Sequence, residues 1–275
     1  MTSTTGSTQQ LANRVRRAVV LTHGTPQAIG SALARLATVA REAEVELVHD
    51  DAADVDVDLA IVLGGDGTML RALTRFLGTG VAVIGVNFGR VGFLSSIPRG
   101  DLEPGLARAF AGEYSVVELP TLDVAVGDDR RVAVNDLVVA SAVVGRMIQL
   151  EWAVGEETLG RLACDGVVCA TPSGSTGYNF SNGGPVLVWG LDAMAITFIA
   201  PHSLNARPLV VPRGREAIVW NRTVDLAATV LVDGHSVVDL PPGGRVVARI
   251  GDQRSLLATL PEATFFSRYS RTFAS

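Results

Sequence analysis

Apolar residues in the first third of the chain follow two alternating patterns, one typical of buried strands and one typical of helices. Four continuous apolar runs predict strands, at residues 18–21, 45–48, 59–63 and 81–86. Helices are expected from Pro26, over 68–77 and in a segment that ends near Phe110. Continuously apolar strands between helices are typical of a mostly parallel sheet covered on both faces. Residues 1–117 are therefore predicted to form a Rossmann-like α/β domain.

The pattern changes after about residue 118, where short segments rich in β-branched residues are separated by Gly, Pro, Asn or Asp. This spacing predicts an all-β sandwich domain over 118–256. Its strands are expected at 123–126, 131–139, 147–154, 167–170, 195–199, 217–220, 228–232 and 245–250. The last segment, 257–275, contains an amphipathic stretch and is expected to return to the α/β domain. We expect a ligand site in the cleft between the two domains.

The composition narrows the range of partners. The 275 residues are 48% hydrophobic and 19% charged, with a net charge of −5, so no sequence-wide basic field attracts nucleic acid or a membrane surface. No apolar run reaches the roughly 20 residues that a membrane span needs. The chain contains no Lys, and all 23 basic residues are Arg. Phosphate binding must therefore use Arg, backbone N–H groups or a metal.

The cysteines and the first residues bear on the compartment. Cys164 and Cys169 form no metal-ligand pattern and are expected to be two buried, unpaired thiols in a reducing cytoplasm. Residues 1–13 are rich in Ser, Thr and Gln and contain no apolar core of a secretory signal. We expect a disordered tail there, with a transit peptide as the alternative because arginines follow.

The segment Gly64-Gly65-Asp66-Gly67-Thr68 lies directly between a predicted strand and a predicted helix. Its glycines let a polyphosphate approach the backbone, and the helix N-terminus supplies free N–H donors. A carboxylate repels phosphate, so Asp66 is better suited to take a proton from an attacking hydroxyl or to orient a metal. The alternative is a glycine-rich turn with Asp66 near the N-cap.

A second stretch, TPSGSTGY at 171–178 followed by SNGGP at 181–185, combines hydroxyls and glycines with one aromatic ring. Hydroxyl and N–H groups can hold phosphate or ribose, and Tyr178 offers a face on which a base can stack. The alternative is an ordinary Ser/Gly loop with Tyr178 packed in the core.

Asn135 and Asp136 interrupt the apolar strand expected over 131–139, where polar groups are costly to bury. The amide suits the hydrogen-bonding edge of adenine and the carboxylate suits a ribose hydroxyl. A tight hairpin turn is the alternative. His202 and His235 could be catalytic bases, although a structural role in loops is favoured, and Asp233-Gly234 predicts a simple turn.

Together and in this order, these segments resemble the NAD kinases. The glycine-aspartate turn alone is also similar to turns of lipid kinases and phosphofructokinases. The motifs TPSGSTGY, NGGP and PHSLNARPL are far more specific, and Gly92-Phe93-Leu94 and the tail at 265–268 also fit. The resemblance runs from about Val57 to Pro212 and implies an α/β domain followed by a β-sandwich, with NAD between them.

The resemblance also implies roles for particular residues. Asp66 falls at the proton acceptor for the 2′-hydroxyl of the adenosine ribose. The candidate loop for the phosphate donor, which the glycines and the helix N-terminus indicate by themselves, is formed by Gly64, Gly65, Gly67 and Thr68. The remaining implied NAD contacts are Asp66 itself, Gly67, Arg71, Phe93, Asn135, Asp136, Arg146, Ala163, Asp165, Thr176, Gly177, Tyr178, Ser181 and His235. A solvated side chain is the alternative for Arg71.

Three positions depart from the family pattern. Asp136 replaces a Glu, Ala163 replaces a basic residue, and His235 replaces a Gln. They keep a non-catalytic dinucleotide sensor open as an alternative, and the shared glycine-aspartate turn keeps a lipid or small-alcohol kinase open.

The resemblance further implies an enzyme that makes NADP from NAD with ATP or polyphosphate as donor. We expect a divalent cation, Mg²⁺, held by the donor phosphates with no protein side chain assigned as its ligand. A homodimer or homotetramer is expected, with no nucleic-acid or membrane partner.

Overall fold

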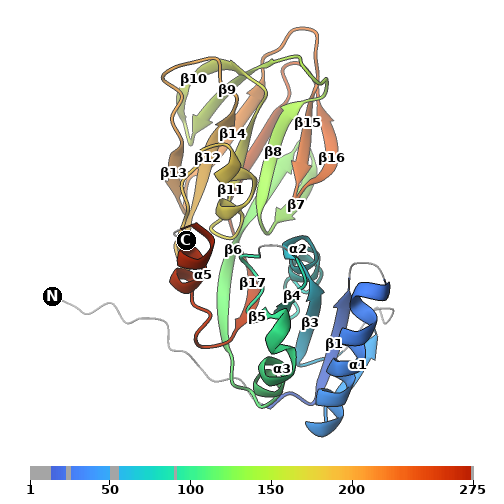
Figure 1. Cartoon of the computed structure of the whole chain (residues 1–275). Coiled ribbons are helices and arrows are strands. Elements are labelled where there is room, and N and C mark those ends of the chain that lie inside the picture. Colours follow the sequence, from blue (N-terminus) through green and yellow to red (C-terminus); the bar gives the residue numbers. More distant parts are fainter. Residues whose placement is uncertain (1–13, 23–25, 50–55, 90–91, 274–275) are drawn as a thin grey trace, which may run out of the picture. The chain divides into compact units, whose positions relative to one another are not determined.

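A computed structural model describes residues 14–22, 26–49, 56–89 and 92–273, which divide into two compact units (Figure 1). The first unit comprises Met1–Glu118 and Ser255–Ser275, and the second comprises Leu119–Arg254. Both divisions fall inside strands, β6 (Ser115–Val126) and β17 (Arg245–Thr259). The sequence predicted them after residues 117 and 256. The tail over 1–13, predicted to be disordered, lies outside the described residues.

The first unit contains a parallel sheet. Its strands lie in the order β4-β3-β1-β2, with the short β5 beside β4 and the end of β17 pairing with β4 in parallel through Leu257 and Val83. The bounds are β1 Arg17–Thr22, β2 Glu46–His49, β3 Leu59–Gly64, β4 Ala82–Asn87 and β5 Ile97–Pro98. Every residue of β3 is buried, as its continuous apolar run predicts.

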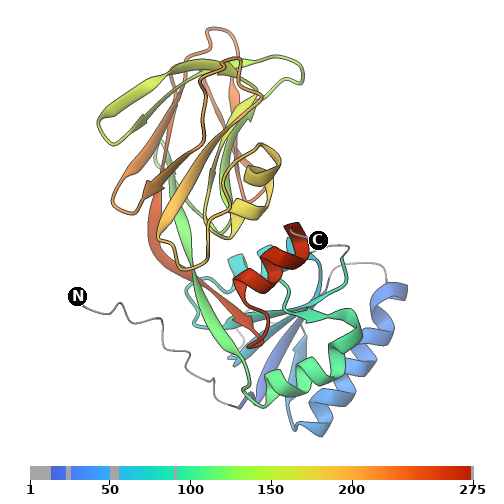
Figure 2. The same ribbon diagram turned by 60° about the vertical axis from the view of Figure 1, so that its left-hand side comes forward.

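Four α-helices accompany this sheet in the described part of the unit. They are α1 (Pro26–Glu42), α2 (Asp66–Arg75), α3 (Leu102–Phe110, after a 3₁₀ turn at Arg99–Asp101) and α5 (Phe265–Phe273). Helices α1 and α3 lie side by side, as Figure 2 shows, and share a core with Leu59, Ile61 and Leu63 of β3. No described helix is long and apolar enough to cross a membrane.

The second unit is an antiparallel β-sandwich. One sheet has the order β13-β12-β11-β8-β15-β16. Its strands are β8 Asp136–Ser141, β11 Gly166–Ala170, β12 Ala193–Ile199, β13 Leu209–Pro212, β15 Ala228–Val232 and β16 His235–Leu240. The other sheet runs β10-β9-β14-β17, with β6 pairing with β17 and β7. Its further strands are β7 Asp129–Ala133, β9 Ile148–Val154, β10 Glu157–Cys164 and β14 Glu216–Asn221.

Apolar side chains from both sheets form the sandwich core, in which Trp152 and Phe198 meet edge to face at 5.3 Å between ring centroids. Cys164 and Cys169 lie in this core as free thiols, as predicted. Burial raises the pKa of each to about 12, so both thiols stay protonated and unreactive at neutral pH. The predicted fold class, an α/β unit followed by a β-sandwich, is confirmed.

Two details of the sequence prediction are wrong. The single strand expected over 131–139 is broken, because β7 ends at Ala133 and β8 begins at Asp136. Strands β10, β13 and β16 were not predicted. Their side chains are largely exposed, so they carry no clear alternation of apolar and polar positions.

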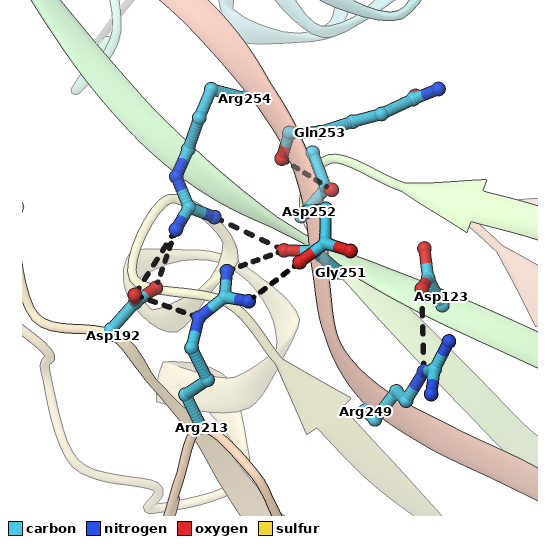
Figure 3. A network of polar contacts seen from close by, with 9 residues as sticks. Asp123, Asp192, Arg213, Arg249, Gly251, Asp252, Gln253 and Arg254 are labelled. Atoms are coloured by element: carbon cyan, nitrogen blue, oxygen red, sulfur yellow. Dashed lines mark hydrogen bonds and ion pairs between the residues drawn. The ribbon is translucent and has the colours of Figure 1, made fainter.

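Polar contacts tie β17 to a loop of the sandwich (Figure 3). The carboxylate of Asp192 accepts hydrogen bonds from the guanidinium groups of Arg213, at 2.8 Å, and Arg254, at 3.0 Å. Both arginines also donate to the carbonyl of Gly251. Asp192 precedes β12, Arg213 follows β13, and Gly251 and Arg254 lie in β17. These contacts therefore join the start of β12, the end of β13 and the middle of β17.

Candidate active site

The glycine-aspartate turn joins the buried end of β3 to the start of α2. A Cβ atom at Gly64 would lie only 2.6 Å from Oγ1 of Thr68, so a side chain there would displace the first turn of the helix. The backbone N–H groups of Thr68 and Met69 donate to the carbonyl of Gly65. Gly67 is exposed, with open space where a side chain would be. The turn therefore presents an open backbone beside the N-terminus of α2.

The Asp66 carboxylate points from this helix start toward the segment after β4. It accepts hydrogen bonds from the backbone N–H groups of Phe93 (2.7 Å) and Leu94 (3.1 Å). Burial raises the pKa of this carboxyl, while the hydrogen bonds from residues 93–95 and the charge of Arg268 oppose the rise. A fixed carboxylate with a raised pKa is a better proton acceptor than a solvated one.

Phe93 and Arg71 are placed differently around this carboxylate. The Phe93 ring is buried, with its centroid 5.4 Å from that of Phe265 and 6.1 Å from that of Phe273, both in α5. In this arrangement Phe93 meets Asp66 through its backbone N–H and not through its ring. Arg71 lies exposed on α2, one helical turn past Thr68.

In the second unit, Asn135 and Asp136 are held by a carboxylate distant in sequence. Oδ2 of Asp233 accepts the N–H of Val134 at 2.9 Å, and Oδ1 accepts the N–H groups of Asn135 at 2.7 Å and Asp136 at 3.2 Å. The backbone N–H of Asp233 donates in return to the carbonyl of Asp136. Burial and the nearby charge of Asp233 raise the pKa of Asp136 to about 7. These bonds explain the break between β7 and β8.

The loop after β11 packs onto the same two residues. Thr171 donates its N–H to the carbonyl of Asn135 and its hydroxyl to the carbonyl of Val134. The hydroxyl of Ser173 donates to Oδ1 of Asn135 at 2.9 Å, which leaves the amide NH₂ of Asn135 facing away from that bond. A Cβ atom at Gly174 would overlap the Asn135 carbonyl, so only glycine allows this close approach.

Residues 174–181 form two short helical turns, η2 (Gly174–Thr176) and α4 (Tyr178–Ser181). The Tyr178 side chain is 47% exposed, so the alternative that it packs in the core is wrong. Gly177 and Ser181 are exposed as well, and Thr176 is half-buried. The buried side chain of Asn179 holds these turns in place. Its amide NH₂ donates to the carbonyls of Ser175 and Pro185, and its Oδ1 accepts from the hydroxyl of Thr197.

The structure separates the other predicted contacts of the sandwich into two groups. His235 begins β16 directly after the Asp233-Gly234 turn and so lies near Asp136, which pairs with Ala170 at one end of β11. Asp165 precedes the other end of β11, about 16 Å away at the usual rise of a strand. Ala163 lies two residues before Asp165, and the carbonyl of Ala163 accepts a hydrogen bond from the backbone N–H of His202. Within this unit, Asp165 and Ala163 are not beside Asn135.

Arg146 follows β8 in the loop to β9 and is exposed. Its guanidinium forms an ion pair with Asp225 at 3.0 Å. Among the contacts of the described residues, none joins Arg146 to Asn135, Asp136 or Tyr178.

Sequence reasoning missed two residues that organise these sites. The sequence predicts only a simple turn at Asp233, and positive φ angles at Asp233 and Gly234 confirm that turn, but the Asp233 carboxylate also binds three N–H groups. For Arg268 the sequence indicates only a tail that fits the family. The signal for both was an ionisable residue inside a matching motif.

An α/β unit with a half-buried carboxylate at a glycine turn, and a sandwich unit with an exposed hydroxyl- and glycine-rich loop, have the features of a phosphotransferase acting on a nucleotide. Residues 4–114 match the family model of the ATP-NAD kinase N-terminal domain, and residues 134–260 match that of the C-terminal domain. The chain belongs to the NAD kinase family.

Individual relatives agree with this assignment. An NAD kinase of Heliobacterium modesticaldum is 37% identical over 80% of this chain and 82% of its own. The crystal structure of an Archaeoglobus fulgidus NAD kinase in complex with ATP is 27% identical, with a TM-score of 0.79 over 94% of this chain and 97% of that one. Yeast NADH kinase complexed with NADH, at 21% identity and a TM-score of 0.81, shares the fold over 95% of this chain and 88% of that one.

The predicted activity is thereby confirmed. The protein is a kinase that phosphorylates the 2′-hydroxyl of the adenosine ribose of NAD to give NADP.

Proposed function

We propose that Asp66 is the general base of this reaction and that Asn135, Asp136 and Tyr178 hold the adenosine part of NAD. The observation that carries the proposal is the Asp66 carboxylate itself, fixed by two backbone N–H groups at the open glycine turn, with a pKa raised by burial. A base of this kind removes a proton from a sugar hydroxyl more effectively than an exposed aspartate does.

The reaction then runs as an in-line displacement. As the 2′-oxygen attacks the terminal phosphorus, its proton passes to an Asp66 carboxylate oxygen, the new O–P bond forms, and the bond to the bridging oxygen breaks. The shortened donor leaves with the electron pair of that bond. The turn formed by Gly64, Gly65, Gly67 and Thr68 lies at the N-terminus of α2, whose partial positive charge favours the donor phosphates.

The sandwich residues supply groups that match adenosine. Because Oδ1 of Asn135 accepts from Ser173, its NH₂ group remains as a donor for a ring nitrogen of adenine. Asp136 offers a carboxylate to a ribose hydroxyl, and the exposed Tyr178 ring offers a face for the base. Thr176, Gly177, Ser181 and His235 complete the proposed nucleotide-binding surface.

We further propose ATP as the phosphoryl donor, accompanied by a divalent cation such as Mg²⁺. The ATP complex of the Archaeoglobus relative supports this choice of donor. The described residues contain no cluster of three or more His, Cys, Asp or Glu that could hold a metal, so the cation would take most of its ligands from the donor phosphates. When bound, the cation neutralises the charge that develops on the transferred phosphoryl group.

We also propose that the enzyme works as a homo-oligomer in the cytoplasm. The buried, unpaired thiols of Cys164 and Cys169 fit a reducing compartment. The separation of Asp165 and Ala163 from Asn135 along β11 supports an oligomer, because a second copy could bring its Asp165 end to the nucleotide bound near Asn135. Mixing two inactive variants, Asp66→Asn and Asp165→Ala, should then restore part of the activity, whereas a monomer would show no rescue.

The test of the base is Asp66→Asn, with Asp101→Asn as a matched control at another helix start of the same unit. We expect Asp66→Asn to lower kcat by roughly 10²- to 10⁴-fold while NAD still binds by calorimetry, and the control to keep its kcat. NADP formation would be followed with ATP and with polyphosphate, each with Mg²⁺ and with EDTA. Near-normal kcat in Asp66→Asn would refute the assignment.

A further inference from the structure

The backbone of the segment Phe93-Leu94-Ser95 binds a negative and a positive side chain, the carboxylate of Asp66 through its N–H groups and the guanidinium of Arg268 through its carbonyls. Its N–H groups at Phe93 and Leu94 donate to the Asp66 carboxylate. Its carbonyls at Phe93 and Ser95 accept from Nη1 of Arg268, at 2.8 and 2.5 Å. The peptide groups of this segment therefore connect the carboxylate of α2 to a guanidinium of α5.

The Arg268 side chain is as deeply buried as an apolar core residue of the first unit. Its side chain is only 1% exposed, and its Nε donates to the carbonyl of Ala263 at 3.0 Å. The helix that carries it is fixed by aromatic contacts of Phe265 and Phe273 with the ring of Phe93. A buried guanidinium is costly, and packing of α5 alone would be served equally well by an apolar side chain.

We propose that Arg268 is a positioning residue for catalysis, which fixes the Phe93–Ser95 backbone and thereby the orientation of the Asp66 carboxylate. The inference rests on the proposed role of Asp66 as general base. It assigns to α5, at the far end of the sequence from the glycine turn, a part in placing the proton acceptor.

The charges around Asp66 give the proposal a second consequence. The positive charge of Arg268 lowers the pKa of Asp66, against the larger effect of burial. Asp66 in turn raises the pKa of Arg268, while burial and the neighbouring Arg271 lower it to about 10, so Arg268 stays charged at neutral pH. The Phe93–Ser95 segment adds no ionisable side chain between them. Loss of the Arg268 charge should therefore make Asp66 harder to ionise.

The experiment compares Arg268→Met and Arg268→Lys with Arg108→Met. Arg108 is a matched control, because its guanidinium binds Glu262 just before α5, whereas its side-chain hydrogen bonds among the described residues go to Glu113 and Glu262 and not to the Phe93–Ser95 segment. We expect Arg268→Met to lower kcat about 10- to 100-fold with the KM for NAD little changed, as a misplaced catalytic group does. In Arg268→Met, the acidic limb of the pH profile of kcat should move to higher pH, because Asp66 is harder to ionise. Arg268→Lys should recover part of kcat and keep the acidic limb near that of the wild type.

Further measurements separate the possible failures. If Asp66→Asn keeps its activity, the base assignment fails and this inference fails with it. If Asp66→Asn is inactive while folded Arg268→Met retains wild-type kcat and pH profile, only the role of Arg268 is overturned. Should Arg268→Met not fold, Arg268→Gln takes its place, because it keeps a donor but removes the charge, and wild-type kcat with an unmoved acidic limb in that variant would overturn the role equally. The double variant should be no slower than Asp66→Asn alone, since the arginine acts through that carboxylate.

Discussion

The backbone N–H of Asn135 donates a 2.7 Å hydrogen bond to the carboxylate of Asp233, which lies 98 residues later in the chain. The same carboxylate binds the N–H groups of Val134 and Asp136, so one side chain fixes three consecutive peptide groups between β7 and β8. The two residues proposed to bind adenosine are thus placed by a hairpin on the neighbouring strand β15.

Replacing Asp233 should weaken NAD binding more than catalysis. We expect Asp233→Ala to raise the KM for NAD at least about tenfold and to destabilise the protein by about 2 kcal/mol, because up to three N–H groups lose a charged acceptor. Asp233→Asn keeps an acceptor oxygen and should lie between Ala and the wild type. Steady-state kinetics and chemical unfolding would measure both effects. An unchanged KM in Asp233→Ala would contradict the placement.

Asp136 should make stability depend on pH. The pKa of Asp136 is raised from 3.8 to about 7 in the folded protein. Between these two pH values, the carboxyl group is therefore protonated in the folded state and ionised in the unfolded state. Its contribution to stability is therefore largest below pH 3.8, falls as the pH rises, and stays low above pH 7. The difference in unfolding free energy between the wild type and Asp136→Asn, measured from pH 4 to pH 8, should shift in favour of the variant as pH increases. A difference that is constant with pH would contradict the raised pKa.

Gly174 should not tolerate a methyl group. Because a Cβ atom there would overlap the carbonyl of Asn135, Gly174→Ala must push the Thr171–Ser173 loop away from the nucleotide-binding residues. We expect a loss of roughly 1–3 kcal/mol in stability together with a higher KM for NAD. Gly30→Ala is the control, since Gly30 lies exposed in α1 of the other unit and a Cβ atom there would meet nothing within 4 Å. Equal melting temperatures for the two variants would refute this explanation.

Gly67 gives the opposite case, in which a methyl group should stabilise the fold and impair the chemistry. Gly67 lies in the first turn of α2 with open space around it, so Gly67→Ala should raise stability by up to about 1 kcal/mol through helix propensity. If donor phosphates approach this backbone closely, the KM for ATP should rise several-fold at the same time. A stabilised variant with an unchanged KM for ATP would show that the phosphates lie elsewhere.

The first unit could be predicted largely from local patterns, because its strands are continuously apolar and its helices carry a clear stripe. Leu59 to Leu63 predicted β3, and the glycines after it predicted the turn that carries Asp66. The break between Ala133 and Asp136 could not be predicted, since it depends on hydrogen bonds from Asp233 on another strand. The same holds for Arg268, whose partners at Phe93 and Ser95 are 175 and 173 residues away.

The sequence-based list of site residues mixed groups that the fold keeps apart. Asn135 and Tyr178 belong to segments that the Thr171–Ser173 loop joins, whereas Asp165 precedes the opposite end of β11. Spacing along the chain carries no information about which end of a strand a residue occupies until the strand pairing is known. That pairing is set by contacts distant in sequence, between β11 and β8.

The first unit is discontinuous in sequence, because Ser255–Ser275 joins it only after the whole of the second unit. On the ribosome, the parallel sheet must therefore wait for its strand β17, and the Phe93–Ser95 segment for Arg268, until the sandwich has been synthesised. A growing chain carries the glycine turn without the helix that completes its surroundings until residues 265–273 have been made. Catalytic competence is in this way coupled to synthesis of residues 255–275, which follow the whole sandwich.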